Sequence, residues 1–391
     1  MIAILMGALL STSAFVEVVD PSAREVSIQA LIRLPKLGAK DLAKLEIIAR
    51  AIPKQTEAYS RREVLTITGG QPVHCEITPD ILYISEYVQP DNVKAGLSLM
   101  ESLVHKATLT QDNLDAAALE VARPDYWSDA LNPSILPLVK VSQDEALILY
   151  HRVIRPERLM LAVGGKVVPG EAQDLWEKRM DRWTPDPAPK GYFDDSLPVV
   201  RDRSTAAVTT IDLVGAPVSA NDAAFSVQVL AMFALGSGKG ASLFRIVREK
   251  HAWSYRQEAV LSPMLEGWRP QIIVAMIPSE EAGLRAETIK TDLLADVKLW
   301  TDSDLARALG MADAVLTRNV PFSPLYVLGS NPVGNSIADR TFMAGYWMLK
   351  TGKPWDPAAL LESMKHVTLD DLKDHATSIL QSTKAQILPG G

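Results

Sequence analysis

The sequence predicts an α+β protein of two homologous tandem domains, each a mostly antiparallel sheet covered by helices. Three observations predict this class. Segments that alternate like strands are separated by groups of amphipathic helical segments. The same order of elements occurs twice, at an offset of about 180–190 residues. The run Pro-Asp-Pro-Ala-Pro-Lys-Gly at 185–191 lies between the copies, and its three prolines and one glycine cannot lie inside a helix or central strand.

These observations divide the 391 residues into a candidate signal segment, two domains and a linker. The signal segment is 1–14, the first domain 15–183, the linker 184–198 and the second domain 199–391. A chain of this length can bury two sizeable cores, whereas one uninterrupted domain of the same length is unusual.

The first half begins with an alternating run and ends with a helix before the linker. Period-two alternation or short apolar runs predict strands at 24–34, 63–68, 80–88 and 159–167, with Gly69-Gly70 as a turn. Helical spacing of apolar residues predicts helices at 41–52, 91–106, 111–121, 143–154 and 170–183.

The second half repeats this order. Strands are predicted at 206–214, 255–261, 271–277 and 385–388. Helices are predicted at 221–235, 280–300, 304–316, 336–349 and 369–380.

The composition is that of a soluble globular protein, with 47% hydrophobic and 22% charged residues. A formal net charge of −7 and the lack of a long basic run argue against a nucleic-acid partner. The single cysteine, Cys75, excludes an internal disulfide and a cysteine-based zinc site.

The first residues are apolar through Leu10, and Ser11-Thr12-Ser13-Ala14 follows. Small residues at Thr12 and Ala14 suit signal-peptidase cleavage after Ala14, but a positively charged n-region is missing. An N-terminal strand, or a start codon assigned too late, is the alternative. A periplasmic or secreted location is therefore favoured slightly over a cytoplasmic one. No other stretch reaches the roughly 18 apolar residues of a membrane helix, so no membrane span is expected.

The segment 236–255 carries the most informative motif. A glycine-rich turn precedes a helical stripe of Leu243, Phe244, Ile246 and Val247, and a strand-like run follows. Arg248 is expected near the helix end and Tyr255 at the strand entrance, where a planar cation and a phenol could reach one carbonyl. Packing is the alternative, because an arginine at a helix end is favourable and a tyrosine often packs at a strand entrance.

This segment resembles the C-terminal half of M16-family metallopeptidases, such as pitrilysin-like enzymes and the mitochondrial processing peptidase. The family pattern is approximately Leu-Phe-x-x-Val-Arg-Glu-Lys followed by Gly-Leu-x-Tyr. This chain keeps the spacing from Arg248 to Tyr255 but has Ala252 and Trp253 in place of Gly-Leu. The two-half organisation extends the resemblance over nearly the full chain and implies the LuxS/MPP-like metallohydrolase type of fold.

The same resemblance implies that the zinc motif is absent. In the family, the first helix carries His-x-x-Glu-His, in which histidines bind zinc and the glutamate is the general base. The matching positions here are Lys44, Ile47 and Ile48, which can neither bind zinc nor activate water. Glu120 lies near the position where the family has the last zinc ligand, but a single carboxylate does not make a zinc site. No metal is therefore expected in this chain.

Two other motifs were weighed against structural roles. His74, Cys75 and Glu76 lie on a strand-like segment, and ordinary surface or core roles are favoured over a metal site. The run 236–242 has Gly240 rather than Ser or Thr after Lys239, and it follows a helix rather than a strand. A helix-capping loop is therefore favoured over a phosphate-binding loop.

In the family, active sites lie in a closed chamber made from two such two-domain units. Some members divide the work between a zinc-bearing chain and a partner that supplies the arginine and tyrosine. The resemblance implies that this chain is the second kind, inactive alone, with Arg248 and Tyr255 contacting the peptide carbonyl in trans and zinc held by the partner. The alternative is a catalytically inactive peptide-binding or assembly scaffold, in the form of a homodimer. Hydrolysis by the chain alone is the third hypothesis.

Overall fold

The computed structural model describes residues 14–121, 139–183, 208–265, 267–318 and 336–389. These residues form two units, each with its own sheet and helical layer. Unit 1 contains the described residues up to 183 together with Thr341–Gly352, and unit 2 contains the other described residues. The units are therefore not contiguous in sequence. The proline-rich linker at 185–191 lies outside the described residues.

Unit 1 is built on a five-stranded mixed sheet with the order β1-β5-β2-β4-β3. β1 runs parallel to β5, and the other strand pairs are antiparallel. β2 and β5 are buried along almost their whole length, because both faces of the sheet are covered. The strands are β1 (Ala14–Val19), β2 (Val26–Arg33), β3 (His74–Ile77), β4 (Ile81–Val88) and β5 (Leu159–Gly165).

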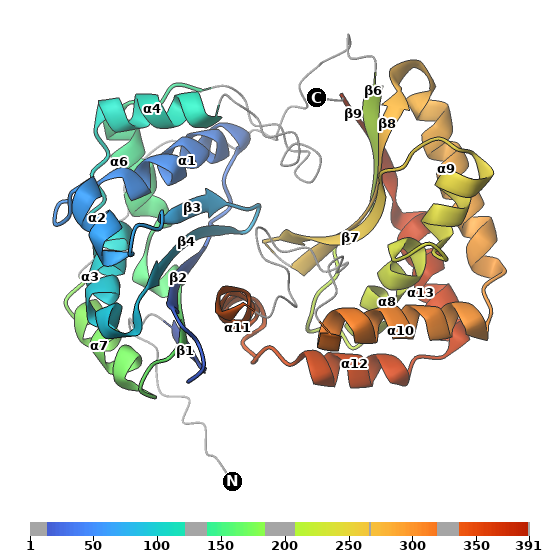
Figure 1. Ribbon diagram of the computed structural model, residues 1–391. Helices are drawn as coiled ribbons and strands as arrows, with labels where there is room; N and C mark the ends of the chain where they lie inside the picture. Colours follow the sequence, from blue (N-terminus) through green and yellow to red (C-terminus); the bar gives the residue numbers. More distant parts are fainter. Residues whose placement is uncertain (1–13, 122–138, 184–207, 266, 319–335, 390–391) are drawn as a thin grey trace. The chain divides into compact units, whose positions relative to one another are not determined.

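Six described helices gather on one side of this sheet (Figure 1). The core of unit 1 lies between the two layers and includes Ile28 of β2 and Leu45 and Ile48 of α1, all fully buried. The helices are α1 (Ala39–Ala51), α2 (Arg61–Ile67), α3 (Val93–His105), α4 (Gln111–Val121), α6 (Gln143–Val153) and α7 (Glu171–Met180).

The opposite face of the unit 1 sheet is covered by α11 (Ile337–Thr351), which comes from the second half of the sequence (Figure 1). The ring of Tyr83 on β4 meets the ring of Phe342 edge to face, with 5.0 Å between centroids. A Cβ at Gly345 would lie only 2.8 Å from the Cβ of Ala162, so the close approach of helix and sheet requires glycine there.

Unit 2 is built on a four-stranded antiparallel sheet with the order β7-β8-β6-β9. Its helices lie on one side of the sheet (Figure 1), where α8 packs against β7 and α9 packs against β6 and β9. The strands are β6 (Val208–Val214), β7 (Gln257–Met264), β8 (Gly267–Pro278) and β9 (Lys384–Pro389). The helices are α8 (Phe225–Gly236), the π-helix η4 (Phe244–Lys250), α9 (Ala282–Lys298), α10 (Asp302–Arg318), α12 (Pro357–Lys365) and α13 (Leu369–Ser382).

The predicted α+β class is confirmed, and most predicted elements are present within a few residues of their expected ends. One prediction is wrong: the segment 63–68, expected as a strand, belongs to helix α2. Ser60 and Glu63 form a capping box there, with the Ser60 N–H donating to Glu63 Oε2 at 2.8 Å. This cap starts a helix where alternation alone suggested a strand.

β1 and α12 were not among the predicted elements, whereas β3 coincides with the strand-like segment of His74, Cys75 and Glu76. β1 begins at Ala14, in the region for which an N-terminal strand was the alternative to a signal segment; residues 1–13 lie outside the described ranges. Within the described residues, no helix is long and apolar enough to cross a membrane.

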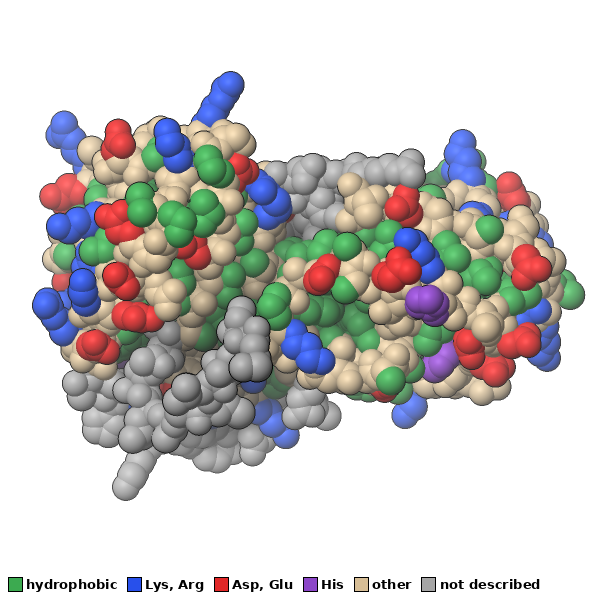
Figure 2. Space-filling view, turned by 90° about the horizontal axis from the view of Figure 1, so that it is seen from below, with side chains coloured by type: hydrophobic (Ala, Val, Ile, Leu, Met, Phe, Trp, Pro, Cys, Tyr) green, Lys and Arg blue, Asp and Glu red, His purple; other side chains and the backbone are tan. Residues whose placement is uncertain are grey.

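Surface charge in the visible part of the molecule is mixed in sign. On the face seen in Figure 2, Lys and Arg side chains are interspersed with Asp and Glu side chains. The overall formal charge of −7 is therefore not concentrated in one patch on that face.

Candidate functional site

The three positions that match the zinc motif have structural roles on α1. The ammonium of Lys44 lies 2.9 Å from Glu145 Oε1, across the contact between α1 and α6. Hydrogen bonds from Ser142 and Lys44 lower the pKa of Glu145 to about 2. Ile47 and Ile48 are core residues, with 3% and 0% of their surface exposed.

The remaining candidate ligands are also separated from one another. Glu120, near the expected place of the last ligand, pairs with Lys54 at 2.6 Å on the surface of unit 1. Cys75 on β3 is buried, which raises the pKa of its thiol, while His74 is exposed. Among the described residues, no group of three or more His, Cys, Asp or Glu side chains could hold a metal ion.

The glycine-rich run at 236–242 begins at the last residue of α8, Gly236, and follows the helix. The guanidinium of Arg307 donates to the carbonyl oxygens of Ala234 at 2.8 Å and Ser237 at 2.9 Å. Trp300 Nε1 donates to the buried hydroxyl of Ser242 at 3.0 Å. The two bonds from Arg307 satisfy carbonyl groups that the end of α8 leaves without partners, and the Trp300 bond holds the loop that follows.

Arg248 and Tyr255, the two predicted site residues, lie side by side. The guanidinium carbon of Arg248 is 4.5 Å from the centroid of the Tyr255 ring and 5.0 Å from that of Phe244. Arg248 lies in the last turn of η4, and Tyr255 lies two residues before β7. Tyr255 is 80% exposed, and Arg248 is also exposed. The cation–π contact therefore places the N–H donors and the phenol at one accessible position.

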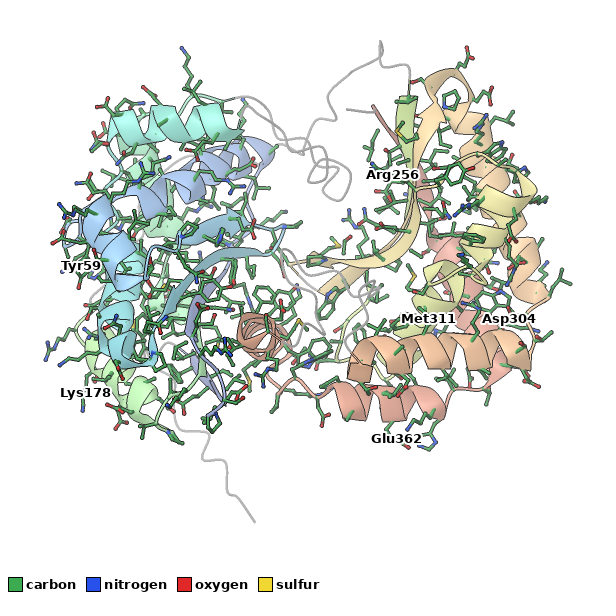
Figure 3. All side chains as sticks on the ribbon, viewed as in Figure 1. Tyr59, Lys178, Arg256, Asp304, Met311 and Glu362 are labelled. Carbon is green, nitrogen blue, oxygen red and sulfur yellow. The ribbon has the colours of Figure 1, made fainter. Side chains whose placement is uncertain are left out.

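The helix that carries Arg248 is fixed to its neighbours by Arg245. The Arg245 guanidinium donates to Asp296 Oδ2 on α9 at 2.7 Å and to Asp304 Oδ1 on α10 at 3.2 Å. Asp304 is labelled on α10 in Figure 3. Because the guanidinium is a planar fork, two carboxylates hold it in one orientation and keep η4 against α9 and α10.

The turn between Arg248 and Tyr255 is held by Asp292 of α9. Asp292 Oδ2 lies 2.7 Å from both Lys250 Nζ and His251 Nε2. Burial alone would raise the pKa of Asp292. The hydrogen bonds from Lys250 and His251 have the larger combined effect, so the pKa of Asp292 lies below its usual value. The carboxylate is therefore ionised at neutral pH and anchors the end of η4.

Stacked rings and a serine hydroxyl complete the anchoring. The Trp253 ring stacks on the His251 ring, with 4.0 Å between the two centroids. The guanidinium carbon of Arg285 lies 4.8 Å from the centroid of the Trp253 ring. The hydroxyl of Ser254 donates to the carbonyl oxygen of Ala275 on β8 at 2.6 Å. Tyr255 thus projects from a turn that is tied to both α9 and the sheet.

Sequence patterns did not reveal Asp292, Arg285 or Met276. Asp292 and Arg285 lie on an amphipathic helix among other charged residues, and only the tertiary fold brings them to the turn. Met276 has a positive φ of 63° and is 49% exposed on β8. Methionine carries no signal for a positive φ, so its placement could not be predicted.

Two sheets, each covered by helices, define a tandem α+β protein with an exposed arginine–tyrosine pair in its second unit. Residues 140–308 match the family model described as the peptidase M16 inactive domain. This match includes Arg248 and Tyr255. No curated protein matches the sequence.

Solved structures extend the likeness over nearly the whole chain. A peptidase M16 inactive domain from Pseudomonas fluorescens is 14% identical, with a TM-score of 0.69 and coverage of 97% of this chain and 96% of that chain. A protease from Helicobacter pylori is 13% identical, with a TM-score of 0.72 and coverage of 97% and 98%. The periplasmic protease PqqL from Escherichia coli is 11% identical, with a TM-score of 0.64; the match covers 95% of this chain but 43% of PqqL. The chain therefore has the fold of these M16-like structures, and its residues 140–308 match the M16 inactive-domain model.

Proposed function

We propose that this chain is the non-zinc subunit of an M16-like metallopeptidase. In this proposal a partner chain carries the zinc, and this chain supplies Arg248 and Tyr255 as contacts to the carbonyl of the peptide. The observation that carries the proposal is the exposed Arg248–Tyr255 pair, with 4.5 Å between the guanidinium carbon and the ring centroid.

The donors of this pair are available to a ligand. No hydrogen bond or ion pair joins the Arg248 guanidinium or the Tyr255 phenol to another described residue. A purely packing tyrosine would be expected to bury its ring, whereas Tyr255 is 80% exposed. An arginine fork and a phenol together suit an oxygen that gains negative charge during peptide hydrolysis.

The residues of α1 favour a subunit that depends on a partner. Lys44 is paired with Glu145, and Ile47 and Ile48 are buried in the core. None of the three can bind zinc or accept a proton from water. The match of residues 140–308 to an inactive domain supports the same proposal.

The mechanism assigned to this chain is electrostatic. Zinc, when bound in the partner, supplies an activated water. Arg248 and Tyr255 would orient the scissile carbonyl and stabilise the charge that develops on its oxygen. Anchoring of the turn by Asp292 and Trp253 would keep these donors in place before the peptide binds, which lowers the cost of reorganisation.

The proposed location is the periplasm or another secreted compartment. The signal-like residues 1–14 support it, as does the likeness to a periplasmic protease from Escherichia coli.

The test is reconstitution with a chain that bears His-x-x-Glu-His, captured by co-purification from the source cell. We expect Arg248→Lys or Tyr255→Phe to lower turnover by about 10²–10³-fold, the usual cost of one lost oxyanion donor. The double variant should cost less than the product of the singles, because both groups act on one oxygen. Arg182→Lys and Tyr59→Phe are matched controls in unit 1 and should leave turnover unchanged.

Three results would contradict the proposal. Unchanged turnover with a lowered melting temperature would show that Arg248 and Tyr255 are structural. A zinc-free homodimer that never associates with a zinc-bearing chain would favour the scaffold alternative. Elemental analysis that finds one tightly bound zinc per chain would overturn the assignment of Lys44, Ile47 and Ile48 to the motif positions.

A further inference from the structure

A carboxyl group without a hydrogen-bond partner lies inside the core of unit 1. Glu86 is on β4, where it pairs with Ile28 of β2, and its exposed fraction is 0%. Neither of its carboxyl oxygens has a hydrogen-bond partner among the described residues. An isolated carboxylate is very costly to bury, so a group in such a place keeps its proton instead. The surroundings of Glu86 therefore suit a neutral carboxylic acid and not a carboxylate.

The Glu86 side chain lies where α3 comes very close to the sheet. A Cβ at Gly96 of α3 would lie 3.4 Å from Glu86 Oε1, 2.7 Å from Ile28 Cδ1 and 2.9 Å from Val88 Cγ1. Even a methyl group therefore does not fit between the helix and the strand at this point. Hydration of an ionised Glu86 would require α3 to move away from β4.

The neighbouring strands bring no opposite charge to Glu86. Side chains alternate between the two faces of a sheet, so Cys75 of β3 shares the face of Glu86, whereas Arg33 of β2 and His74 and Glu76 of β3 lie on the other face. Cys75 is buried as well, and burial raises the pKa of its thiol, so it stays neutral.

The helices over this face bring no compensating charge either. Glu101 of α3 pairs with Arg179 of α7 at 3.0 Å, and His105 lies at the opposite end of α3 from Gly96. The other Asp, Glu, Lys and Arg residues of α2, α3 and α7 are exposed. Burial alone raises the pKa of Glu86 well above its usual range. The exposed residues are Arg61, Arg62, Glu63, Lys94, Glu171, Asp174, Glu177 and Lys178, of which the last is labelled in Figure 3.

We propose that Glu86 makes the contact between α3 and the unit 1 sheet sensitive to pH. The neutral acid lets α3 pack against β4. Transfer of its proton to solvent water leaves a carboxylate in an apolar contact, and α3 loosens so that water can reach the charge. No other reactant takes part. The proposal is independent of the arginine–tyrosine pair, because Glu86 belongs to unit 1 and that pair belongs to unit 2.

The sign of the pH dependence follows from the burial of Glu86. A glutamate in the unfolded chain has a pKa of about 4.3, and the pKa of folded Glu86 is higher. The stability contributed by this proton is therefore fully present below the unfolded pKa and is lost as the pH rises towards the folded pKa. Between the two pKa values, one proton changes the folding equilibrium constant by about tenfold per pH unit.

The experiment compares the full wild-type chain with Glu86→Gln and Glu86→Leu from about pH 5 to about pH 9, on either side of neutrality. Denaturant unfolding measures the unfolding constant, and hydrogen exchange of α3 peptides measures local opening. We expect the unfolding constant of the wild type, relative to either variant, to rise about tenfold per pH unit until the folded pKa is reached. At high pH, α3 peptides should exchange faster in the wild type than in the variants.

Two variants keep the test decisive, and two controls localise the effect. A glutamine amide at position 86 also lacks partners, but its cost is the same at every pH, and leucine removes the polar atoms altogether. Glu57→Gln removes an exposed carboxyl of unit 1 and should keep the wild-type pH profile. Peptides of α9 in unit 2 should exchange equally in the wild type and in the variants at each pH.

Three results would overturn the proposal. Parallel pH profiles of the wild type, Glu86→Gln and Glu86→Leu would show that Glu86 does not change its charge in the folded chain. Variants that become less stable than the wild type as the pH rises would show that the carboxylate is the stabilising form. Exchange of α3 that accelerates equally in the wild type and in both variants would assign the pH effect to another group.

Discussion

Ala252 shows at the scale of one residue why the M16 pattern has glycine before its tyrosine. The pattern reads Gly-Leu-x-Tyr, and this chain has alanine at the glycine position. Its φ of 53° lies in the left-handed region, which glycine adopts without a steric penalty. The backbone of the turn is therefore formed despite the substitution, and Trp253 gains the stacking contact with His251.

We predict that Ala252→Gly stabilises the protein by about 1 kcal/mol, because relief of the left-handed strain exceeds the extra entropy of an unfolded glycine. Denaturant unfolding of the full chain measures the change. Ala116→Gly, at an exposed position of α4, should instead destabilise by about 0.5–1 kcal/mol. Equal losses for both variants would show that the conformation at Ala252 carries no strain.

Individual residues of the candidate site could be predicted only where they lie close to one another in the sequence. The seven-residue interval from Arg248 to Tyr255 crosses one helix end and one turn, and the sequence predicted that the two would converge. Asp292 reaches the same region from α9 through long-range packing, with its Oδ2 2.7 Å from Lys250 Nζ and His251 Nε2. This contact does not follow from periodicity, which indicates the buried face of a helix but not which segment lies against its other side.

At the scale of elements, the sequence predicted α11 as a helix but not the sheet against which it packs. Its periodicity indicates an apolar face without indicating which sheet that face covers. The structure places Thr341–Gly352 in unit 1, although the flanking segments belong to unit 2. A polar cluster specifies the position: Asp80 Oδ2 accepts hydrogen bonds from Tyr346 and from Lys350, each at 2.7 Å. The side chains of Lys350 and Asp80 are 8% and 2% exposed.

We predict that Lys350→Met or Asp80→Asn alone destabilises the protein by about 3–5 kcal/mol, because each leaves a buried charge without its partner. The double variant should lose less than the sum of the singles, which thermal and denaturant unfolding would measure. Lys365→Met is the matched control, because its pair with Glu362 is exposed to solvent and should contribute little to stability. A loss at Lys350 as small as that at Lys365 would mean that the ion pair does not hold α11.

At the scale of the whole molecule, the duplication was visible in the sequence and is present in the fold. The strands β2, β3, β4 and β5 of unit 1 correspond in order to β6, β7, β8 and β9 of unit 2. The short helix α2 occupies the place of η4, between the first helix and the second strand of each copy. α11 is different, because it interrupts the second copy and covers the sheet of the first.

This exchange predicts that the first half cannot fold fully by itself. A fragment of residues 1–198 contains the whole unit 1 sheet but lacks α11, so Tyr83, Leu31 and Ala162 would lose their cover. We expect the fragment to bind a hydrophobic dye and to melt without cooperativity. A synthetic peptide of residues 336–353, added in trans, should suppress dye binding and restore a cooperative transition, because it returns the aromatic contact and the bonds to Asp80.

The Gly345→Leu peptide is the control for this complementation. A Cβ at that position already lies 2.8 Å from the Ala162 Cβ and 2.9 Å from the Leu31 Cδ1, so a larger side chain would hold the helix away from the sheet. The Gly345→Leu peptide keeps Tyr346 and Lys350, and we expect that it still fails to restore cooperative melting of the fragment. If the fragment melts cooperatively without any peptide, α11 is not required for unit 1. If both peptides restore the transition equally, the helix binds the fragment by a mode other than the close contact between Gly345 and β5.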